Sequence, residues 1–162
     1  MSDTDRIVKS VVLKAPRERV WRALSESSEF GSWFGMDFDG PFVAGRPITG
    51  RIAPTKVDPE VAKMQAQYAG RAFEFRIGRI EPMDRIELHW HPFAVDPNVD
   101  YSREPMTLIE FVLEDVDGGT RLTITESGFD RIPLARRAEA FRMNEGGWTE
   151  QVKNIERHVS KP

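Results

Sequence analysis

The chain has 162 residues, of which 40% are hydrophobic and 30% charged, with 23 basic against 26 acidic side chains and no cysteine. A chain of this length forms about one domain with a core of its own, and without cysteine it can hold neither a disulfide framework nor a thiolate zinc site. The basic residues are scattered and the formal net charge is −3, which excludes a nucleic-acid-binding stripe and a polybasic membrane patch and leaves small molecules or proteins as partners.

The N-terminal part of the chain predicts a strand followed by two short helices. Residues 6–14 are β-branched and partly alternating, as in a strand, and Pro16 ends that strand and begins a helix. This helix has an apolar side and gives way around residues 25–28. A second helical piece over residues 29–34 carries three aromatic side chains, and Gly35 stops it.

Three later stretches have weaker patterns. Dense glycine and proline punctuation over residues 36–52 is typical of two short edge strands joined by tight turns. Residues 54–70 are mainly polar, with two prolines and weak helical spacing, so we expect a mobile excursion for which a lid is one open role. Residues 92–105 form a loop rich in proline and aspartate.

Alternating apolar residues predict two hairpins around these stretches. Strands over residues 73–78 and 86–91 flank a Pro-Met-Asp turn and share one apolar face. Strands over residues 109–114 and 122–124 flank an Asp-Gly-Gly turn, which is a strong hairpin signal.

The last segment predicts a long helix with one apolar seam. Apolar residues recur at spacings of three and four from residue 134 to residue 159, with one acid among them. Gly146 and Gly147 lie in the middle of this helix, where they predict either a kink or the close approach of another backbone. The seam consists of Leu134, Ala138, Phe141, Glu145, Trp148, Val152, Ile155 and Val159.

This order of elements predicts an α+β fold over residues 1–162. The alternating strands and the helix seam each need an apolar partner, and a curved antiparallel sheet laid against the C-terminal helix satisfies both.

Four runs of residues resemble one known superfamily. They are APRERVWRAL at 15–24, EFGSWFG at 29–35, LIEFVLEDVDGGTRLTITESGF at 108–129 and NEGGWTEQVKNIERHV at 144–159. Together they resemble the START/birch-allergen-like superfamily, called SRPBCC, and within it the family named for the heat-shock protein 90 ATPase activator homologue. The resemblance implies a helix-grip fold, in which a strongly bent antiparallel sheet wraps the C-terminal helix and often leaves a hydrophobic cavity between them.

The candidate ligand-binding residues are the side chains that this arrangement turns inward. Each aromatic one either lines a cavity or simply fills the core. Glu126 is in phase with the apolar residues of its strand and Glu145 lies in the helix seam, so each is either a ligand anchor or a structural brace. The inward aromatic side chains also include Phe34 and Phe73, and the residues expected to bind the ligand are Trp33, Phe75, Trp90, Phe111, Glu126, Phe129, Phe141, Glu145 and Trp148.

A metal site and a cofactor site have little support in the sequence. Glu87, His89 and His91 share one strand face, where two histidines can chelate zinc but a third ligand from the same strand is poorly placed. We interpret this face as solvated and expect no metal and no cofactor. The chain also carries no GxSxG elbow, HExxH motif or GxxxxGK loop.

Three functions follow as hypotheses. The first is a monomer or homodimer that binds a small, largely hydrophobic molecule between sheet and helix. We expect it in the cytoplasm, because the N-terminal residues carry no signal-like segment and no stretch of the sequence is apolar enough to span a membrane. The second, implied only by the resemblance, is a domain that interacts with the chaperone and stimulates its ATPase. In the eukaryotic activators this domain is one part of a longer chain. We therefore favour ligand binding over an activator role for this sequence. The third, less favoured, is a cyclase or hydrolase with Glu126 or Glu145 as acid or base.

Overall fold

One antiparallel sheet and one long helix organise the protein in a computed structural model that describes residues 5–96 and 98–160. The seven strands lie in the order β1-β7-β6-β5-β4-β3-β2, so the first and the last two strands of the chain are neighbours. The strands are β1 (Arg6–Leu13), β2 (Met36–Phe38), β3 (Pro47–Ile52), β4 (Ala72–Glu81), β5 (Arg85–Trp90), β6 (Thr107–Val116) and β7 (Gly119–Ser127). The helices are α1 (Arg17–Ser25), α2 (Ser27–Phe34), α3 (Pro59–Ala66) and α4 (Leu134–Val159), with a 3-10 turn η1 (Phe129–Arg131) before α4.

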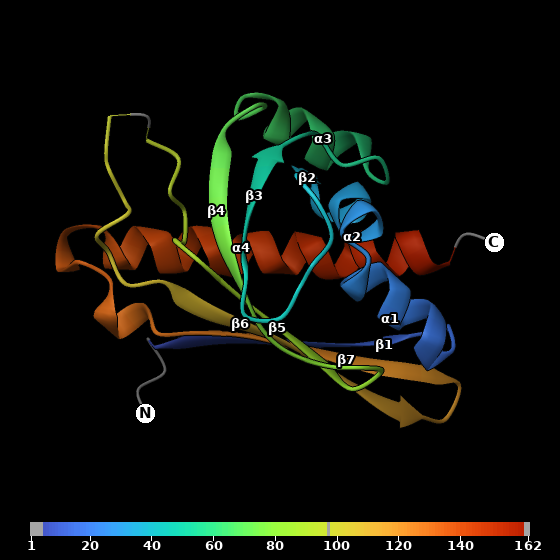
Figure 1. The fold of residues 1–162 in the computed structure, drawn as a ribbon. Coiled ribbons are helices and arrows are strands. Elements are labelled where there is room, and N and C mark those ends of the chain that lie inside the picture. The colour runs from blue at the N-terminus through green and yellow to red at the C-terminus, as the bar shows by residue number, and fades with distance from the viewer. Residues whose placement is uncertain (1–4, 97, 161–162) are drawn as a thin grey trace.

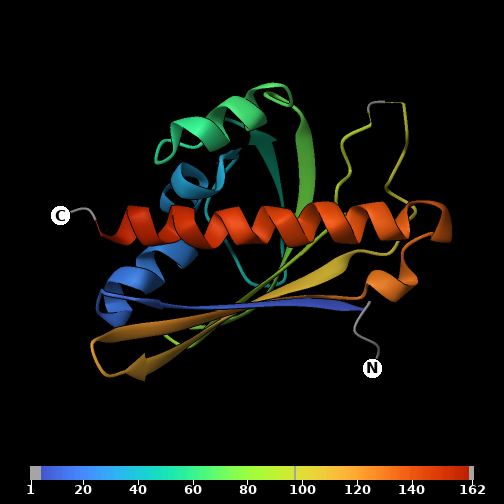
Figure 2. The same cartoon turned by 180° about the vertical axis from the view of Figure 1, so that it is seen from behind.

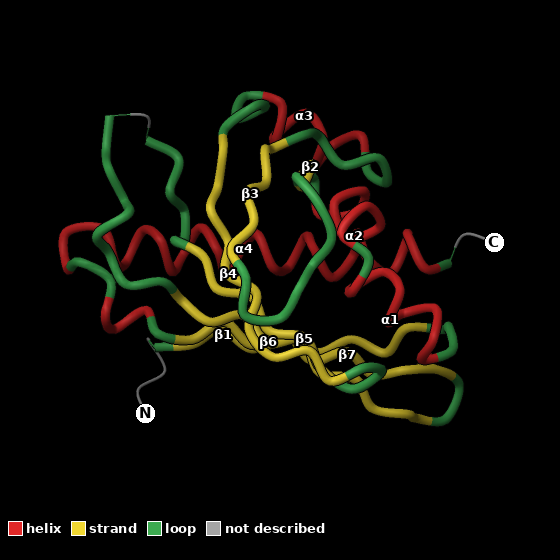
Figure 3. The backbone as a smooth tube through the Cα atoms, viewed as in Figure 1, coloured by secondary structure: helices red, strands yellow, loops and turns green. Residues whose placement is uncertain are grey.

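The sheet is strongly bent, as Figure 3 shows: strands β1 and β7 run along one side of α4, while β3 and β4 rise past it. The register of β4 against β5 shifts between Ile77 and Ile80, where two residues of β4 oppose one of β5. A bulge of this kind bends a strand and increases its twist, so it accounts for the change of direction. The bend creates the concave face into which α4 fits.

Helix α4 crosses the concave face of the sheet, with α1 and α2 at its C-terminal end and the loop of residues 92–105 near its N-terminal end (Figure 1). Seen from behind, α4 lies between α3 on one side and β1 and β7 on the other (Figure 2). This arrangement confirms the predicted α+β helix-grip fold. Both predicted hairpins are present, as are the two short helices after the first strand.

The seam of α4 differs from the predicted one over its first half. Leu134 is 79% exposed and Ala138 is also exposed, because the first turns of α4 face solvent instead of the sheet. The buried side there runs through Ala140, Asn144 and Trp148, at intervals of one turn. From Trp148 onward, Ile155 and Val159 are buried as the spacing predicts.

Two further expectations need correction. Residues 54–70 contain helix α3, which the sequence analysis treated as a mobile excursion. Gly146 and Gly147 neither break α4 nor admit another backbone, since α4 is continuous through both and an added Cβ would meet no atom within 4 Å. Among the described residues, no helix is long and apolar enough to cross a membrane.

Candidate ligand-binding pocket

A pocket of about 480 Å³ opens between the middle of α4, helix α3, strands β3 and β4, and the loop that begins after β5. Most of its wall is apolar, and five aromatic side chains contribute to it, from α2, the segment after α3, β4, β5 and the loop after β5. The apolar and aromatic lining consists of Phe34, Met36, Ile52, Val61, Met64, Tyr68, Phe73, Trp90, Phe93, Val95 and Met143. Gly35, Gly146 and Gly147 add bare backbone, and the polar lining consists of Gln65, Gln67, Arg142, Asn144, Glu150 and Gln151.

The floor of the pocket rests on a cluster of aromatic rings in the core. Phe34 and Trp90 line the pocket, and their ring centroids lie 5.9 Å apart. Trp148 lies behind both, at 5.9 Å from Phe34 and 6.4 Å from Trp90. Such tilted and edge-on contacts hold the rings in fixed orientations, so the floor is a rigid surface.

The carboxyl group of Glu126 lies beneath this floor and accepts hydrogen bonds from four residues. Trp148 Nε1 donates to Oε1 at 2.8 Å, and Trp90 Nε1 donates to Oε2 at 2.7 Å. Thr107 Oγ1 donates to Oε2 at 2.6 Å, and Asn144 Nδ2 lies 3.0 and 3.2 Å from the two oxygens. The side chain is fully buried, with 0% exposure, and is not part of the pocket wall.

Burial raises the pKa of Glu126 above its usual 4.5, and the hydrogen bonds from Thr107, Trp148, Trp90 and Asn144 offset this only in part. The charged form loses its hydration on burial, and no cation pairs with it among the described residues. Glu126 therefore keeps its proton to a higher pH in the folded protein than in the unfolded chain.

This shift gives a testable pH dependence of stability. Between the usual pKa of 4.5 and the raised pKa of the folded state, the folded protein binds more protons than the unfolded chain. The free energy of unfolding must then fall as pH rises through that interval, since it changes with the difference in bound protons. We expect the difference in stability between the wild type and Glu126→Gln, measured by urea denaturation, to shrink as pH rises from about 4.5. A difference that is constant with pH would contradict the assignment.

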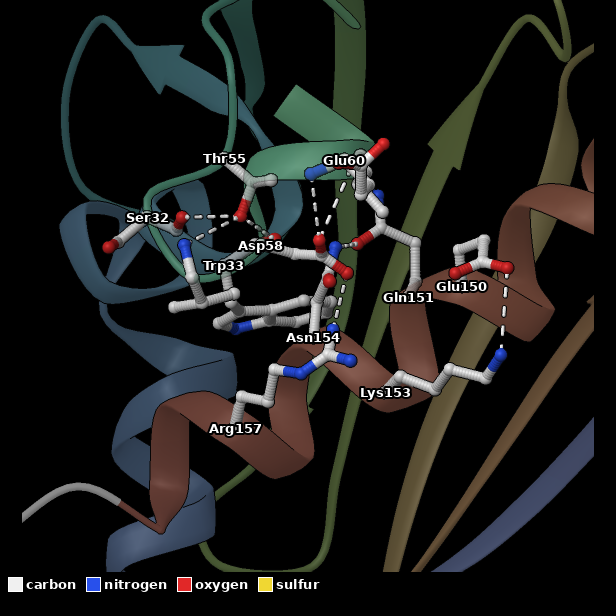
Figure 4. A network of polar contacts seen from close by, with 12 residues as sticks. Ser32, Trp33, Thr55, Asp58, Glu60, Glu150, Gln151, Lys153, Asn154 and Arg157 are labelled. Carbon is white, nitrogen blue, oxygen red and sulfur yellow. Dashed lines mark hydrogen bonds and ion pairs between the residues drawn. The ribbon is translucent and has the colours of Figure 1, made fainter. Parts of the chain in front are cut away.

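Helix α3 is fixed over the pocket by polar contacts at its N-terminal end (Figure 4). Thr55 Oγ1 donates to the backbone oxygens of Ser32 and Trp33, at 3.2 and 2.9 Å, which ties the segment before α3 to α2. Asp58 accepts from the first backbone N–H groups of α3 and pairs with Arg157 of α4. These contacts make α3 a fixed wall of the pocket.

The last turn of α3 is joined to α2 and α4 through one backbone oxygen. Gln65 Nε2 and Gln151 Nε2 both donate to the oxygen of Phe34, at 3.0 and 2.9 Å. Gln65 Oε1 also accepts from the backbone N–H of Thr55 at 2.7 Å. The amide groups of the two glutamines thus join α2, α3 and α4 around the pocket.

The loop of residues 92–96 and 98–105 contributes Phe93 and Val95 to the opposite wall and is held by Arg136 of α4. The guanidinium group donates to Glu104 at 2.9 and 2.6 Å and to the backbone oxygen of Pro92 at 2.8 Å. It also lies over the ring of Tyr101, 4.7 Å from the centroid. Because Arg136 presents a planar fork, it can make all of these contacts at once.

Replacing Arg136 should therefore loosen this wall. We expect Arg136→Ala to speed amide hydrogen exchange of the loop by about tenfold, since charged hydrogen bonds and a cation–π contact together contribute about 1–2 kcal/mol at a partly exposed site. Arg137→Ala is the matched control, because Arg137 donates only to the backbone oxygen of Ile132. Equal exchange rates in both variants would mean that Arg136 does not hold the loop.

The structure distributes the nine predicted site residues over three places. Trp90 lines the pocket, and Trp148 and Glu126 lie directly behind its wall. The fully buried core holds Trp33, Phe75, Phe111 and Phe129, with Phe141 half-buried against Phe129.

Glu145 lies elsewhere than its position in the predicted seam suggested. Its carboxylate pairs with Lys9 of β1, and 46% of the side chain is exposed. The residue before it, Asn144, occupies the inward position instead and binds Glu126. Neither of the two predicted acids belongs to the pocket lining.

The two strand histidines form no metal site with their neighbours. In the described ranges, no group of three or more histidine, aspartate or glutamate side chains lies close enough together to hold a metal ion. Burial lowers the pKa of both His89 and His91, so the neutral form is favoured.

Most of the residues that line the pocket were not among the predicted ones. Val61, Met64 and Tyr68 come from the α3 segment, and Phe93 and Val95 come from the loop after β5. Asp58 followed by Pro59 is a helix-start signal that could have indicated α3. The sequence carries no comparable signal for the loop.

Comparison with known proteins confirms the fold and the predicted resemblance. A family model described as Activator of Hsp90 ATPase homolog 1-like protein matches residues 14–160. A crystal structure of a protein from Mesorhizobium loti is 19% identical, with a TM-score of 0.69 over 96% of this chain and 96% of that one. A crystal structure from Chromobacterium violaceum is 21% identical, with a TM-score of 0.68 over 98% of this chain and 99% of that one.

A solution structure from Arthrobacter aurescens is 17% identical, with a TM-score of 0.73 over 100% of this chain and 91% of that one. At these identities the likeness establishes a shared fold over nearly the whole chain. No curated protein sequence matches.

Proposed function

The chain belongs to the Activator of Hsp90 ATPase homolog 1-like family, and on that premise we propose that it binds a small, largely hydrophobic molecule in the pocket between α3, α4 and the sheet. Its fold commonly leaves a hydrophobic cavity at this place. Such binding needs no cofactor and takes place in the pocket, not on the outer surface.

The observation that carries the proposal is a pocket with a mainly apolar wall and a prearranged floor. Its volume of about 480 Å³ lies within the range of about 300–1,000 Å³ that is usual for small-molecule sites. Phe34, Phe73 and Trp90 line it with aromatic surface, and rigid aromatic surface binds apolar molecules with little loss of side-chain entropy. The described side chains line this space and leave it open to a small molecule.

Native mass spectrometry of the purified protein tests this proposal, combined with organic extraction of whatever co-purifies. We expect a stoichiometric small molecule, or, from a protein without one, saturable binding of naphthol or a fatty alcohol by calorimetry. A clean apo mass together with no measurable binding of either probe would overturn the proposal.

An interaction with heat-shock protein 90 is a second candidate, which rests on the description of the family. It would use an outer surface instead of the pocket. Capture of the purified chaperone, with a change in its ATP turnover, would support this candidate, and no effect at a large molar excess would remove it.

A further inference from the structure

Among the described residues of the pocket wall, Asn144 is the one buried polar residue. Its side chain is 8% exposed, and the other buried residues of the lining are apolar or aromatic. The charged lining residues, Arg142 and Glu150, lie at the exposed rim. A polar contact with a buried side chain of the lining therefore depends on how the amide of Asn144 is oriented.

Glu126 fixes that orientation from behind the wall. The amide nitrogen of Asn144 lies 3.0 and 3.2 Å from the two carboxyl oxygens. With Glu126 ionised, a turned amide would set its oxygen against both carboxylate oxygens at these distances, with no proton between them. The amide N–H group therefore points to Glu126, and the amide oxygen points away from it.

The amide oxygen of Asn144 is left without a partner. Within the described part of the chain, no donor reaches Asn144 Oδ1. It is also absent from the buried unpartnered atoms, which are His91 Nδ1 and Asn154 Oδ1, so solvent or a ligand can reach it. Since Asn144 lines the pocket, this oxygen is a free acceptor in an otherwise apolar wall.

The side-chain N–H group of Trp90 also points to Glu126. It lines the pocket, but its indole N–H group donates to Glu126 at 2.7 Å, so the pocket meets the ring and not the donor. Glu126 thus accepts from the indole N–H group of Trp90 and from one of the two amide N–H groups of Asn144. Among the buried side chains of the described lining, Asn144 Oδ1 is then the one oxygen acceptor.

We infer that the pocket selects molecules whose apolar body carries a hydrogen-bond donor, a hydroxyl or N–H group, directed at Asn144 Oδ1, and that Glu126 is the positioning residue for this selection. The inference rests on the proposed function and specifies its ligand class. A molecule with only an acceptor at that position would set two oxygens against each other, and each would stay unpaired after losing its water.

Two matched pairs of probes test the inference: naphthol with its methyl ether, and decanol with its methyl ether. Apolar burial alone favours the ether of each pair, because the ether loses less hydration. We expect calorimetry to show the alcohol bound about tenfold more tightly in both pairs, as for one buried hydrogen bond that the ether cannot make. Equal binding, or tighter binding of the ethers, would overturn the inference and leave the proposed function standing. No binding of any probe, by a protein whose native mass shows no co-purified molecule, would overturn both.

Three variants locate the selection. Asn144→Leu removes the acceptor and should abolish the preference for alcohols. In Glu126→Gln, the new amide can donate to Asn144 and let it turn, so the preference should fall or reverse, an outcome that a merely structural role of Glu126 would not produce. Glu145→Gln, on α4 outside the pocket lining, is the matched control and should keep the preference. A preference for alcohols that persists in Asn144→Leu would place the selection elsewhere and overturn the inference.

Discussion

Glu126→Ala should lower the free energy of unfolding by about 3–5 kcal/mol, because several buried donors lose their acceptor, at about 1–3 kcal/mol for each one left unsatisfied. The substitution leaves the N–H groups of Trp90, Trp148 and Asn144, and the hydroxyl of Thr107, without their acceptor. It also opens a cavity between β7 and α4. Urea denaturation at a pH near neutrality measures the loss.

Glu145→Ala is the control for this experiment, because Glu145 is the other acid that the sequence pattern turned inward. Its carboxylate is about half exposed and pairs with Lys9 alone. A pair of this kind contributes about 0–1 kcal/mol. If the two variants lost similar amounts of stability, the hydrogen bonds of Glu126 would not be holding strand β7 to helix α4.

The contrast between these two acids shows what the sequence can predict. A strand alternates with a period of two, so Leu122 and Ile124 determine the direction of Glu126 without further information. A helix turns by about 100° per residue, and a stripe of apolar residues at spacings of three and four is wide enough to include either Asn144 or Glu145. The spacing alone therefore does not decide which of the two side chains is buried. The partner of α4 decides which of them is buried. Here Glu126 accepts from Asn144, and Lys9 on β1 holds Glu145.

The walls of the pocket could not be predicted from the sequence, for a related reason. The hairpins and α4 follow from periodicity, because each has one apolar face to bury. Helix α3 and the loop after β5 have little periodicity, and contacts with distant residues hold them in place. Gln65 reaches the backbone of α2, and Arg136 reaches Glu104 from α4. Such contacts depend on the completed fold, and no local pattern announces them.

The glycines of α4 give the second large effect that we expect. Gly147 lies in a helix interior, where glycine destabilises the helix by up to about 1 kcal/mol relative to better helix formers. Packing does not require glycine there, since an added Cβ would meet no atom within 4 Å. What the missing side chain leaves open is the pocket, which Gly147 lines.

Gly147→Leu should therefore raise stability and abolish binding. We expect the free energy of unfolding to rise by about 0.5–1 kcal/mol, because leucine favours the helix and its Cβ would meet no neighbouring atom within 4 Å. The new side chain would occupy the pocket and displace a ligand from about 100 Å² of apolar surface. At about 25 cal/mol per Å², this costs about 2.5 kcal/mol, close to a hundredfold loss of affinity for naphthol or decanol.

Ala138→Leu is the matched control, because it adds leucine to an exposed position of α4 outside the pocket lining and should leave affinity unchanged. Unchanged affinity in Gly147→Leu would mean that the probes do not bind over this face of the helix. A loss of stability in Gly147→Leu would instead mean that the fold itself needs a glycine there. Only a gain in stability together with a loss of binding identifies Gly147 as a residue kept small for the ligand, at a cost to the helix.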